Sequence, residues 1–187
     1  MNQKDLTVFN LGENLDNLMN LDPRGYGVCR ILYKASREYT KKPLTINSAE
    51  KLVDTLKEGD LVYIMTGFVL RPFKKAEMDG IVSTMLLARA LVKGFNVKPV
   101  IVCPEDNMKA VENLAYVVGL HFHDSIEGLS EYPLSLAAIP FTKEAKEASK
   151  QADELISKGF PSAVISIECP GANSKGVYHN AVGLDVT

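Results

Sequence analysis

From residue 60 onward, short apolar runs alternate along the chain with amphipathic segments of helical length. The first run, Leu61–Met65, is continuously apolar, which is typical of a strand buried on both faces of a sheet. Four later runs are also predicted to be strands: 97–102, 120–122, 136–141 and 162–167. The helices predicted between strands cover residues 79–94, 106–118 and 143–158. Because such alternation requires right-handed crossovers, it predicts an α/β fold, with a mostly parallel sheet flanked by helices in a Rossmann-like, three-layer arrangement.

The chain before residue 60 is predicted to be helical, with apolar side chains recurring at helical spacing from Leu11 and again from Val28. We therefore expect a single domain over residues 1–187, in which a helical N-terminal segment (1–58) precedes an alternating core (60–187). The last residues look like a loop that enters a new element. We accordingly expect the sheet to be incomplete and the domain to lack a C-terminal portion.

Charge and cysteine content exclude several classes of protein. The chain carries 21 Lys and Arg against 23 Asp and Glu, and it has no basic block of the kind that binds nucleic acid. Its apolar runs are too short to span a bilayer, and its N-terminus lacks the apolar stretch of a secretory signal. The three scattered cysteines predict reduced thiols. We expect a cytoplasmic protein without nucleic-acid or membrane partners.

Polar residues follow the predicted strands, and in open parallel sheets ligands bind beyond the carboxyl ends of the strands. The residues that we expect at this edge of the sheet include Thr66, Gly67, Glu77, Asp79, Gly80, His123 and Glu168. Neither a dinucleotide-binding fingerprint nor a phosphate-binding loop is present in the sequence. The chemistry is therefore expected to depend on acidic and neutral polar groups.

Glu77, Asp79 and Glu168 are the main candidates for a metal site. Carboxylates gathered at one rim would make a hard-oxygen site suited to Mg²⁺ or Mn²⁺, and without a cation one of them could keep a proton and act as general acid or base. Alternatively, Asp79 is simply the N-cap of the helix that follows, and Glu77 is an exposed acid near its start. We expect Glu168, at the end of an apolar strand, to be partly desolvated and to need a partner. Gly80, at the first helical position, would let a ligand approach the backbone.

His121 and His123 share one face of a predicted strand, because side chains alternate along it. A His-x-His pair can bind a metal, and the alternative is that both rings lie at a solvated strand end. The sequence leaves both interpretations open.

Two blocks of residues carry a resemblance to a known family. The first is Thr66-Gly67-Phe68 followed by Glu77-x-Asp79-Gly80, and the second is Ile167-Glu168-x-Pro170-Gly171 followed by Tyr178-x-Asn180 and Asp185. With this order and spacing, the chain resembles the D-glutamate cyclase C-terminal-like domain family over nearly its whole length. The resemblance implies an α/β fold, an acidic pocket for a divalent metal such as Mn²⁺, and a link to D-glutamate metabolism. Family members normally continue past the equivalent of residue 187.

The resemblance and the acidic residues together suggest a lyase that closes D-glutamate to 5-oxo-D-proline with loss of water. Glu77, Asp79 and Glu168 would hold the cation, and a freed carboxylate or His123 would take the ammonium proton. The residues expected to contact the substrate are Thr66, Gly67, Gly80, Asn180 and Asp185.

Two other functions remain open at this point. One is a metal-dependent enzyme or binding module for another small anionic ligand, phosphorylated or nucleotide-like. The other is a non-catalytic regulatory domain, in which an open sheet edge would recruit a second copy of the chain as a homo-oligomer.

Overall fold

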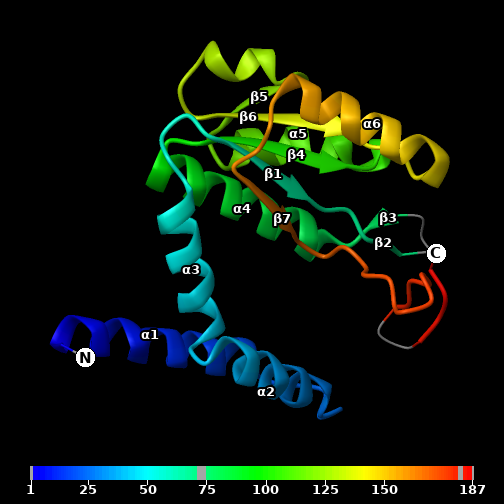
Figure 1. Cartoon of the computed structure of the whole chain (residues 1–187). Coiled ribbons are helices and arrows are strands. Elements are labelled where there is room, and N and C mark those ends of the chain that lie inside the picture. Colours follow the sequence, from blue (N-terminus) through cyan, green and yellow to red (C-terminus); the bar gives the residue numbers. More distant parts are fainter. Residues whose placement is uncertain (1, 71–74, 181–182, 187) are drawn as a thin grey trace. The chain divides into compact units, whose positions relative to one another are not determined.

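The computed structural model describes residues 2–70, 75–180 and 183–186 (Figure 1). The chain divides into two compact units, residues 1–55 and residues 56–187. The division falls close to the end of the helical N-terminal segment that the sequence predicts.

The first unit consists of helices α1 (Gln3–Met19), α2 (Val28–Thr40) and α3 (Leu44–Thr55). Their arrangement depends on the fully buried carboxylate of Asp16 in α1. This carboxylate accepts hydrogen bonds from the backbone nitrogens of Leu44 (2.6 Å) and Thr45 (3.0 Å), at the start of α3, and from the hydroxyl of Tyr33 (3.0 Å) in α2. One side chain thus links all three helices and satisfies amides that the first turn of α3 leaves without helical partners.

The second unit contains a five-stranded sheet with strand order β5-β6-β4-β1-β7, in which all neighbouring strands are parallel. Its strands are β1 (Leu61–Met65), β4 (Lys98–Cys103), β5 (His121–His123), β6 (Ser135–Pro140) and β7 (Ala163–Ser166). All five were predicted from the sequence, and the parallel α/β fold is confirmed. Most residues of the central strands β1, β4 and β6 are buried, as expected of apolar strands covered on both faces.

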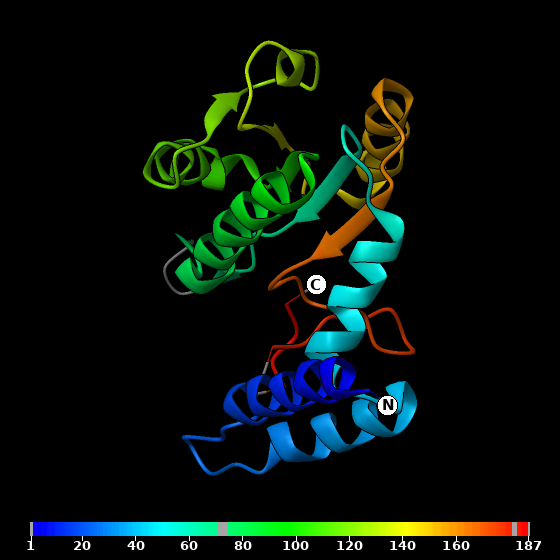
Figure 2. The same ribbon diagram turned by 90° about the vertical axis from the view of Figure 1, so that its left-hand side faces the viewer.

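Helices cover both faces of this sheet. Helix α4 (Met78–Phe95) and helix α5 (Met108–Val117), which follows the short 3₁₀ helix η1 (Glu105–Asn107), pack on one face, and α6 (Ala145–Lys158) lies on the other (Figure 2). On the α6 face, Leu155 packs in a cluster with Tyr63, Val100, Val102, Ala137 and Leu129, the last from the 3₁₀ helix η2 (Glu127–Ser130). The hydroxyl of Tyr63 donates a hydrogen bond to the Leu155 carbonyl at 3.1 Å. The three layers predicted from the sequence are therefore present.

A small antiparallel hairpin, not predicted from the sequence, lies between β1 and α4. It pairs β2 (Val69–Leu70) with β3 (Lys75–Ala76), in a segment for which the sequence predicts neither a strand nor a helix. Each strand has only two residues, too few for an alternating pattern to appear in the sequence. The hairpin contacts η1, so it lies beside the segment that follows β4.

Strands β5 and β7 form the two edges of the sheet. Within the described part of the chain, β7 pairs only with β1, and Val164 on β7 is 59% exposed. The homo-oligomer expected from an open edge stays a prediction. None of the described helices is long and apolar enough to cross a membrane.

The hydrogen bonds to Asp16 lead to a prediction for the first unit. Replacing Asp16 by Ala would leave the Leu44 and Thr45 amides and the Tyr33 hydroxyl without their acceptor, and each buried donor left unpaired costs about 1–3 kcal/mol. We expect Asp16→Ala to lower the free energy of unfolding of this unit by about 3 kcal/mol or more, measured by hydrogen exchange of α1–α3 amides. Asp54→Ala, at an exposed position of α3, is the matched control and should have little effect.

The same carboxylate gives this unit a pH dependence with a definite sign. Burial raises the pKa of Asp16, but hydrogen bonds from Thr45, Leu44 and Tyr33 outweigh that effect and leave the pKa below its ordinary value. Stability from the ionised form is therefore present above the pKa of the unfolded chain. It is lost as the pH falls through the lower pKa of the folded state.

Candidate metal centre

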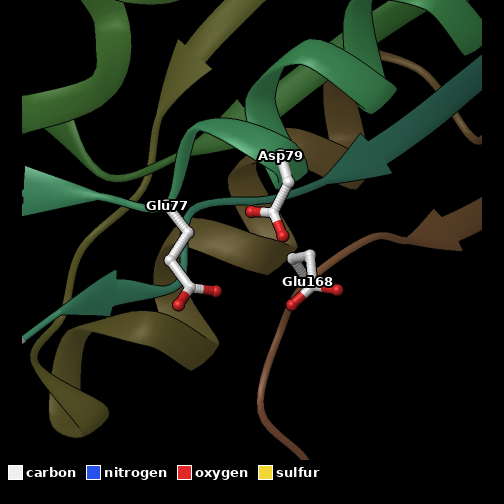
Figure 3. Close-up of side chains that lie close together, drawn as sticks. All are labelled: Glu77, Asp79 and Glu168. Atoms are coloured by element: carbon white, nitrogen blue, oxygen red, sulfur yellow. The ribbon is translucent and has the colours of Figure 1, made fainter. Parts of the chain in front are cut away.

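Three carboxylates meet at the rim formed by the carboxyl ends of β1 and β7. Glu77 lies between β3 and α4, Asp79 lies in the first turn of α4, and Glu168 lies two residues after β7. Each offers a carboxylate oxygen, and these oxygens all lie within 4.8 Å of one another. Figure 3 shows the three carboxylates facing a common space, with Glu168 approaching from a different chain segment than the other two. We call Glu77, Asp79 and Glu168 the acidic triad.

The backbone of Phe68 links two members of the triad. Its amide donates a hydrogen bond to the carbonyl of Glu168 (3.1 Å), and its carbonyl accepts one from the amide of Glu77 (2.9 Å). Because β1 pairs with β7 in a register that places Met65 beside Ser166, Phe68 emerges next to Glu168. The triad is therefore positioned by backbone hydrogen bonds that continue from the strand pairing.

Glu168 occupies a left-handed backbone conformation, with φ of +49°. This region is uncommon for residues other than glycine, and such conformations concentrate at functional sites. A Cβ atom on Gly80 would lie only 2.7 Å from the Cβ of Glu168, so the glycine leaves room for Glu168 against α4. The sequence placed Gly80 at the first helical position, as an approach point for a ligand. It is the third residue of α4, and Glu168 lies against it.

The structure corrects two expectations about the individual acids. Helix α4 begins at Met78, so Glu77 is its N-cap residue, without a capping hydrogen bond from its side chain. Asp79 is therefore not the N-cap; its Oδ1 accepts a hydrogen bond from the Gly80 amide at 2.8 Å. The Glu168 side chain, expected to be partly desolvated, is exposed, because the strand leaves the sheet before reaching it.

The electrostatics of the triad favour a bound cation. Burial raises the pKa of Glu77, and the neighbouring charges of Asp79 and Glu168 raise it further. Among residues 2–70, 75–180 and 183–186, no Lys, Arg or His forms an ion pair with any of the three. The N-terminal end of α4 offsets only part of this negative charge.

The donor set also fits a hard divalent cation. Carboxylate oxygens are the ligands that Mg²⁺ and Mn²⁺ prefer, and neighbouring ligands of such an ion lie about 3 Å apart. The triad oxygens lie within 4.8 Å of one another, so side-chain rotations would have to bring them closer to bind one ion. The residues present therefore suit a metal ion, with coordination positions left over for a ligand.

Two residues at the end of β1 lie beside the triad. Thr66 is 3% exposed, and its Oγ1 would lie 3.2 Å from a Cβ on Gly80. Gly67 has φ of +122°, and a Cβ there would lie 2.5 Å from Nδ2 of Asn107. The missing Cβ of Gly80 therefore leaves room for Thr66, and that of Gly67 leaves room for Asn107. Sequence reasoning missed Asn107, although it lies in η1, shortly after the carboxyl end of β4.

His123 is not brought to the triad. It lies on β5, and β6 and β4 separate this strand from β1, a lateral distance of about 14 Å at ordinary strand spacing. His123 pairs with Ala137 in the middle of β6, so β5 ends before the rim. Its Nε2 is 3.2 Å from Ser135 Oγ, and both His121 and His123 lie against the ring of Tyr132.

A comparison with protein-family models identifies the family. The model described as "D-glutamate cyclase-like, C-terminal" matches residues 15–187. The chain belongs to this family. No curated protein matches the sequence significantly. The family match covers all three acids of the triad together with Thr66 and Asn107.

The other two residues that the family resemblance singled out lie in a C-terminal segment of tight turns. The side-chain oxygen of Asn180 accepts a hydrogen bond from the Leu184 amide (2.9 Å). The backbone of Asp185 forms an isolated antiparallel β-bridge with that of His179. Seven residues earlier, Asn173 makes the same kind of turn by accepting a hydrogen bond from the Val177 amide (3.1 Å). In this family member, Asn180 therefore shapes its own loop.

The raised pKa of Glu77 gives a prediction with a definite sign. In the metal-free protein, charged Glu77 is destabilising above its folded pKa, and this penalty disappears at low pH, where the group is protonated in both states. We expect Glu77→Gln to raise the melting temperature of the metal-free protein at pH 7 and to have no such effect near pH 4. With Mn²⁺ present, Glu77→Gln should have a lower melting temperature than wild type, because the variant loses a metal ligand.

Calorimetric titration of Mn²⁺ provides the second measurement for this variant. Glu105→Gln removes an exposed acid that is not part of the triad and serves as the control. If Glu77→Gln and Glu105→Gln bind Mn²⁺ equally well, the triad is not the metal site.

A second prediction uses the two glycines of α4. In an exposed helix interior Gly→Ala normally stabilises by about 0.5–1 kcal/mol, and we expect this of Gly94→Ala, where a Cβ would meet nothing within 4 Å. Gly80→Ala should instead lower stability and weaken Mn²⁺ binding, because its Cβ would displace Glu168. Thermal unfolding and Mn²⁺ titration of both variants test this. A stabilising Gly80→Ala would contradict the packing described above.

Proposed function

We propose that this protein is a metal-assisted lyase of the D-glutamate cyclase type, which closes D-glutamate to 5-oxo-D-proline with loss of water. The observation that carries the proposal is the acidic triad, three carboxylates without a cationic partner among the described residues, in a chain that belongs to this family. The active site would lie at the carboxyl edge of the sheet, where α/β folds commonly bind their ligands.

The reaction sets clear chemical requirements. The amine nitrogen of D-glutamate attacks the carbon of its own side-chain carboxylate, a C–N bond forms, and a C–O bond breaks to release water. The amine begins as an ammonium ion, loses one proton before it can attack, and loses a second after the C–N bond has formed. The departing oxygen must gain both protons to leave as water, because hydroxide is a poor leaving group. The site therefore has to polarise a carboxylate and move protons.

Glu77, Asp79 and Glu168 would hold the cation. Bound there, a divalent ion would act as a Lewis acid on an oxygen of the substrate carboxylate. The three protein carboxylates would bind this ion at one side and leave the opposite side open, because Asp79 and Glu168 are exposed. The shared negative charge of the triad would also draw the substrate ammonium group toward the rim.

Proton transfer would fall to a carboxylate of the triad that is freed from the cation. The raised pKa of Glu77 describes the metal-free site, where burial and the two neighbouring acids favour its protonated form, and a bound cation would act in the opposite direction. His123, the alternative base suggested by the sequence, lies beyond β4 and β6 and makes no contact with the triad. The geometry thus supports a carboxylate as the base.

The substrate contacts inferred from the sequence receive unequal support. Thr66 has a buried hydroxyl next to Glu168 and Gly80, and it is well placed to orient a ligand. Gly67 and Gly80 would contribute indirectly, by letting Asn107 and Glu168 approach the rim. Contacts from Asn180 and Asp185 remain part of the proposal and rest on the family resemblance.

The decisive experiment incubates the purified chain with D-glutamate and Mn²⁺ and measures 5-oxo-D-proline by chiral chromatography. We expect product from D-glutamate and much less from L-glutamate. Removing the metal with a chelator, or replacing Glu168 by Gln, should lower the rate at least tenfold, on the order of one lost charge-assisted contact. Formation no faster than in buffer would contradict the proposal.

The same triad would also serve a second function, metal-dependent binding of a different small anionic metabolite, either in another reaction or as a regulatory domain. The observation in its favour is the exposure of Asp79 and Glu168, which leaves the cation accessible to ligands of varied size. Mn²⁺ binding without oxoproline formation, together with a thermal shift caused by a phosphorylated or nucleotide-like compound, would support this function.

A further inference from the structure

Two buried polar groups at the rim have no hydrogen-bond partner within the described part of the chain. They are Oγ1 of Thr66, a residue 3% exposed, and Nδ2 of Asn107, a residue 2% exposed. More than about 90% of buried polar groups in proteins are paired, and leaving one unpaired costs about 1–3 kcal/mol. Buried polar atoms of Asn20, Arg37 and Thr84 also lack hydrogen-bond partners in the described chain, so it is the position of Thr66 and Asn107 near the triad that singles these two out.

Both groups lie where the chain leaves β1. Oγ1 of Thr66 would be 3.2 Å from a Cβ on Gly80, and that same Cβ position is 2.7 Å from the Cβ of Glu168. Thr66 therefore borders the acidic triad directly. Nδ2 of Asn107 lies against the backbone of Gly67, the next residue along the chain. One unpaired group thus belongs to Thr66, and the other lies against Gly67, the residue that follows it.

Their chemistry complements that of the triad. An amide NH₂ group offers two donors, and a hydroxyl offers one, so both suit an oxygen that carries negative charge. Asn107 is also the N-cap residue of α5, where the positive end of the helix dipole favours an anion. The triad with its cation would bind one oxyanion, and the Thr66–Asn107 pair would bind another a short distance away.

We propose that Thr66 Oγ1 and Asn107 Nδ2 form a hydrogen-bonding subsite for one carboxylate of a dicarboxylate ligand, whose other carboxylate binds at the cation held by the triad. The inference rests on the proposed function in one respect, because D-glutamate is such a ligand. In that case the subsite holds the carboxylate that does not react, and the reacting side-chain carboxylate lies at the metal.

A donor that stays unpaired until a ligand binds can be distinguished from a donor in a structural hydrogen bond, because its removal stabilises the unliganded protein and weakens ligand binding. Thr66→Val removes the hydroxyl with almost no change of volume, so it removes an unsatisfied polar group from the unliganded protein. We expect Thr66→Val to raise the melting temperature without ligand, and to weaken binding of glutarate in the presence of Mn²⁺ by roughly 10- to 100-fold, the usual worth of a hydrogen bond to a charged group. Thr66→Ser keeps the hydroxyl and should bind nearly as well as wild type.

Thr84 provides a matched control for this substitution. It is completely buried, its Oγ1 also has no partner in the described chain, and it lies one helical turn beyond Gly80 along α4. Thr84→Val should therefore raise stability as well, but leave glutarate binding unchanged. Asn107→Asp is a second, independent variant, because it replaces the donor with a charge that repels a carboxylate and should weaken binding at least tenfold.

Binding is measured by calorimetry with glutarate, which has both carboxylates but no amine and cannot cyclise, and product formation is measured separately with D-glutamate. The subsite is overturned if wild type does not bind glutarate, if Thr66→Val and Asn107→Asp bind it as tightly as wild type, or if Thr66→Val destabilises the unliganded protein. Glutarate binding that depends on Thr66 without any oxoproline formation would overturn the proposed reaction and leave the subsite in place. Oxoproline formation together with glutarate binding that does not depend on Thr66 would overturn the subsite and leave the proposed reaction in place.

Discussion

The parallel pairing of β1 with β7 is the interaction on which the candidate site depends. These strands are distant in sequence, and their register places Met65 beside Ser166, so the segments that follow them leave the sheet side by side. The backbone of Phe68 then bonds to both Glu168 and Glu77. A change of one residue in this register would move Glu168 away from α4 and turn its side chain to the other face of the sheet. The geometry of the triad is therefore a consequence of strand pairing.

Several locally unfavourable features of the second unit lie at this same rim. Glu168 has a left-handed backbone conformation, Glu77 has a raised pKa, and the buried donors of Thr66 and Asn107 lack partners. Each of these costs stability in the unliganded protein, whereas the core strands are apolar and fully packed. A cation would offset the negative charge that raises the pKa of Glu77, and an anionic ligand would pair with the two donors. Such features are expected where a fold binds a ligand.

The sequence predicted the five strands well, because a parallel strand covered on both faces has to be continuously apolar, as Leu61–Met65 is. It did not predict the β2–β3 hairpin, whose strands are too short to carry a pattern. It placed His123 at the rim by assuming that every strand extends to the same edge. Strand β5 stops beside Ala137, in the middle of its neighbour β6, and strand length and register are set by pairing with that neighbour.

What the sequence by itself determined is the α/β fold, the family, and the three acidic residues that follow strands, because hydrophobic patterning and residue order are properties of the chain alone. Only the tertiary structure decided that Glu168 lies against Gly80, that Phe68 ties Glu77 to Glu168, and that the Asn107 side chain lies against Gly67. These contacts join segments remote in sequence. Their distances depend on register, backbone conformation and the space left by a missing Cβ, and none of these is a property of the local sequence.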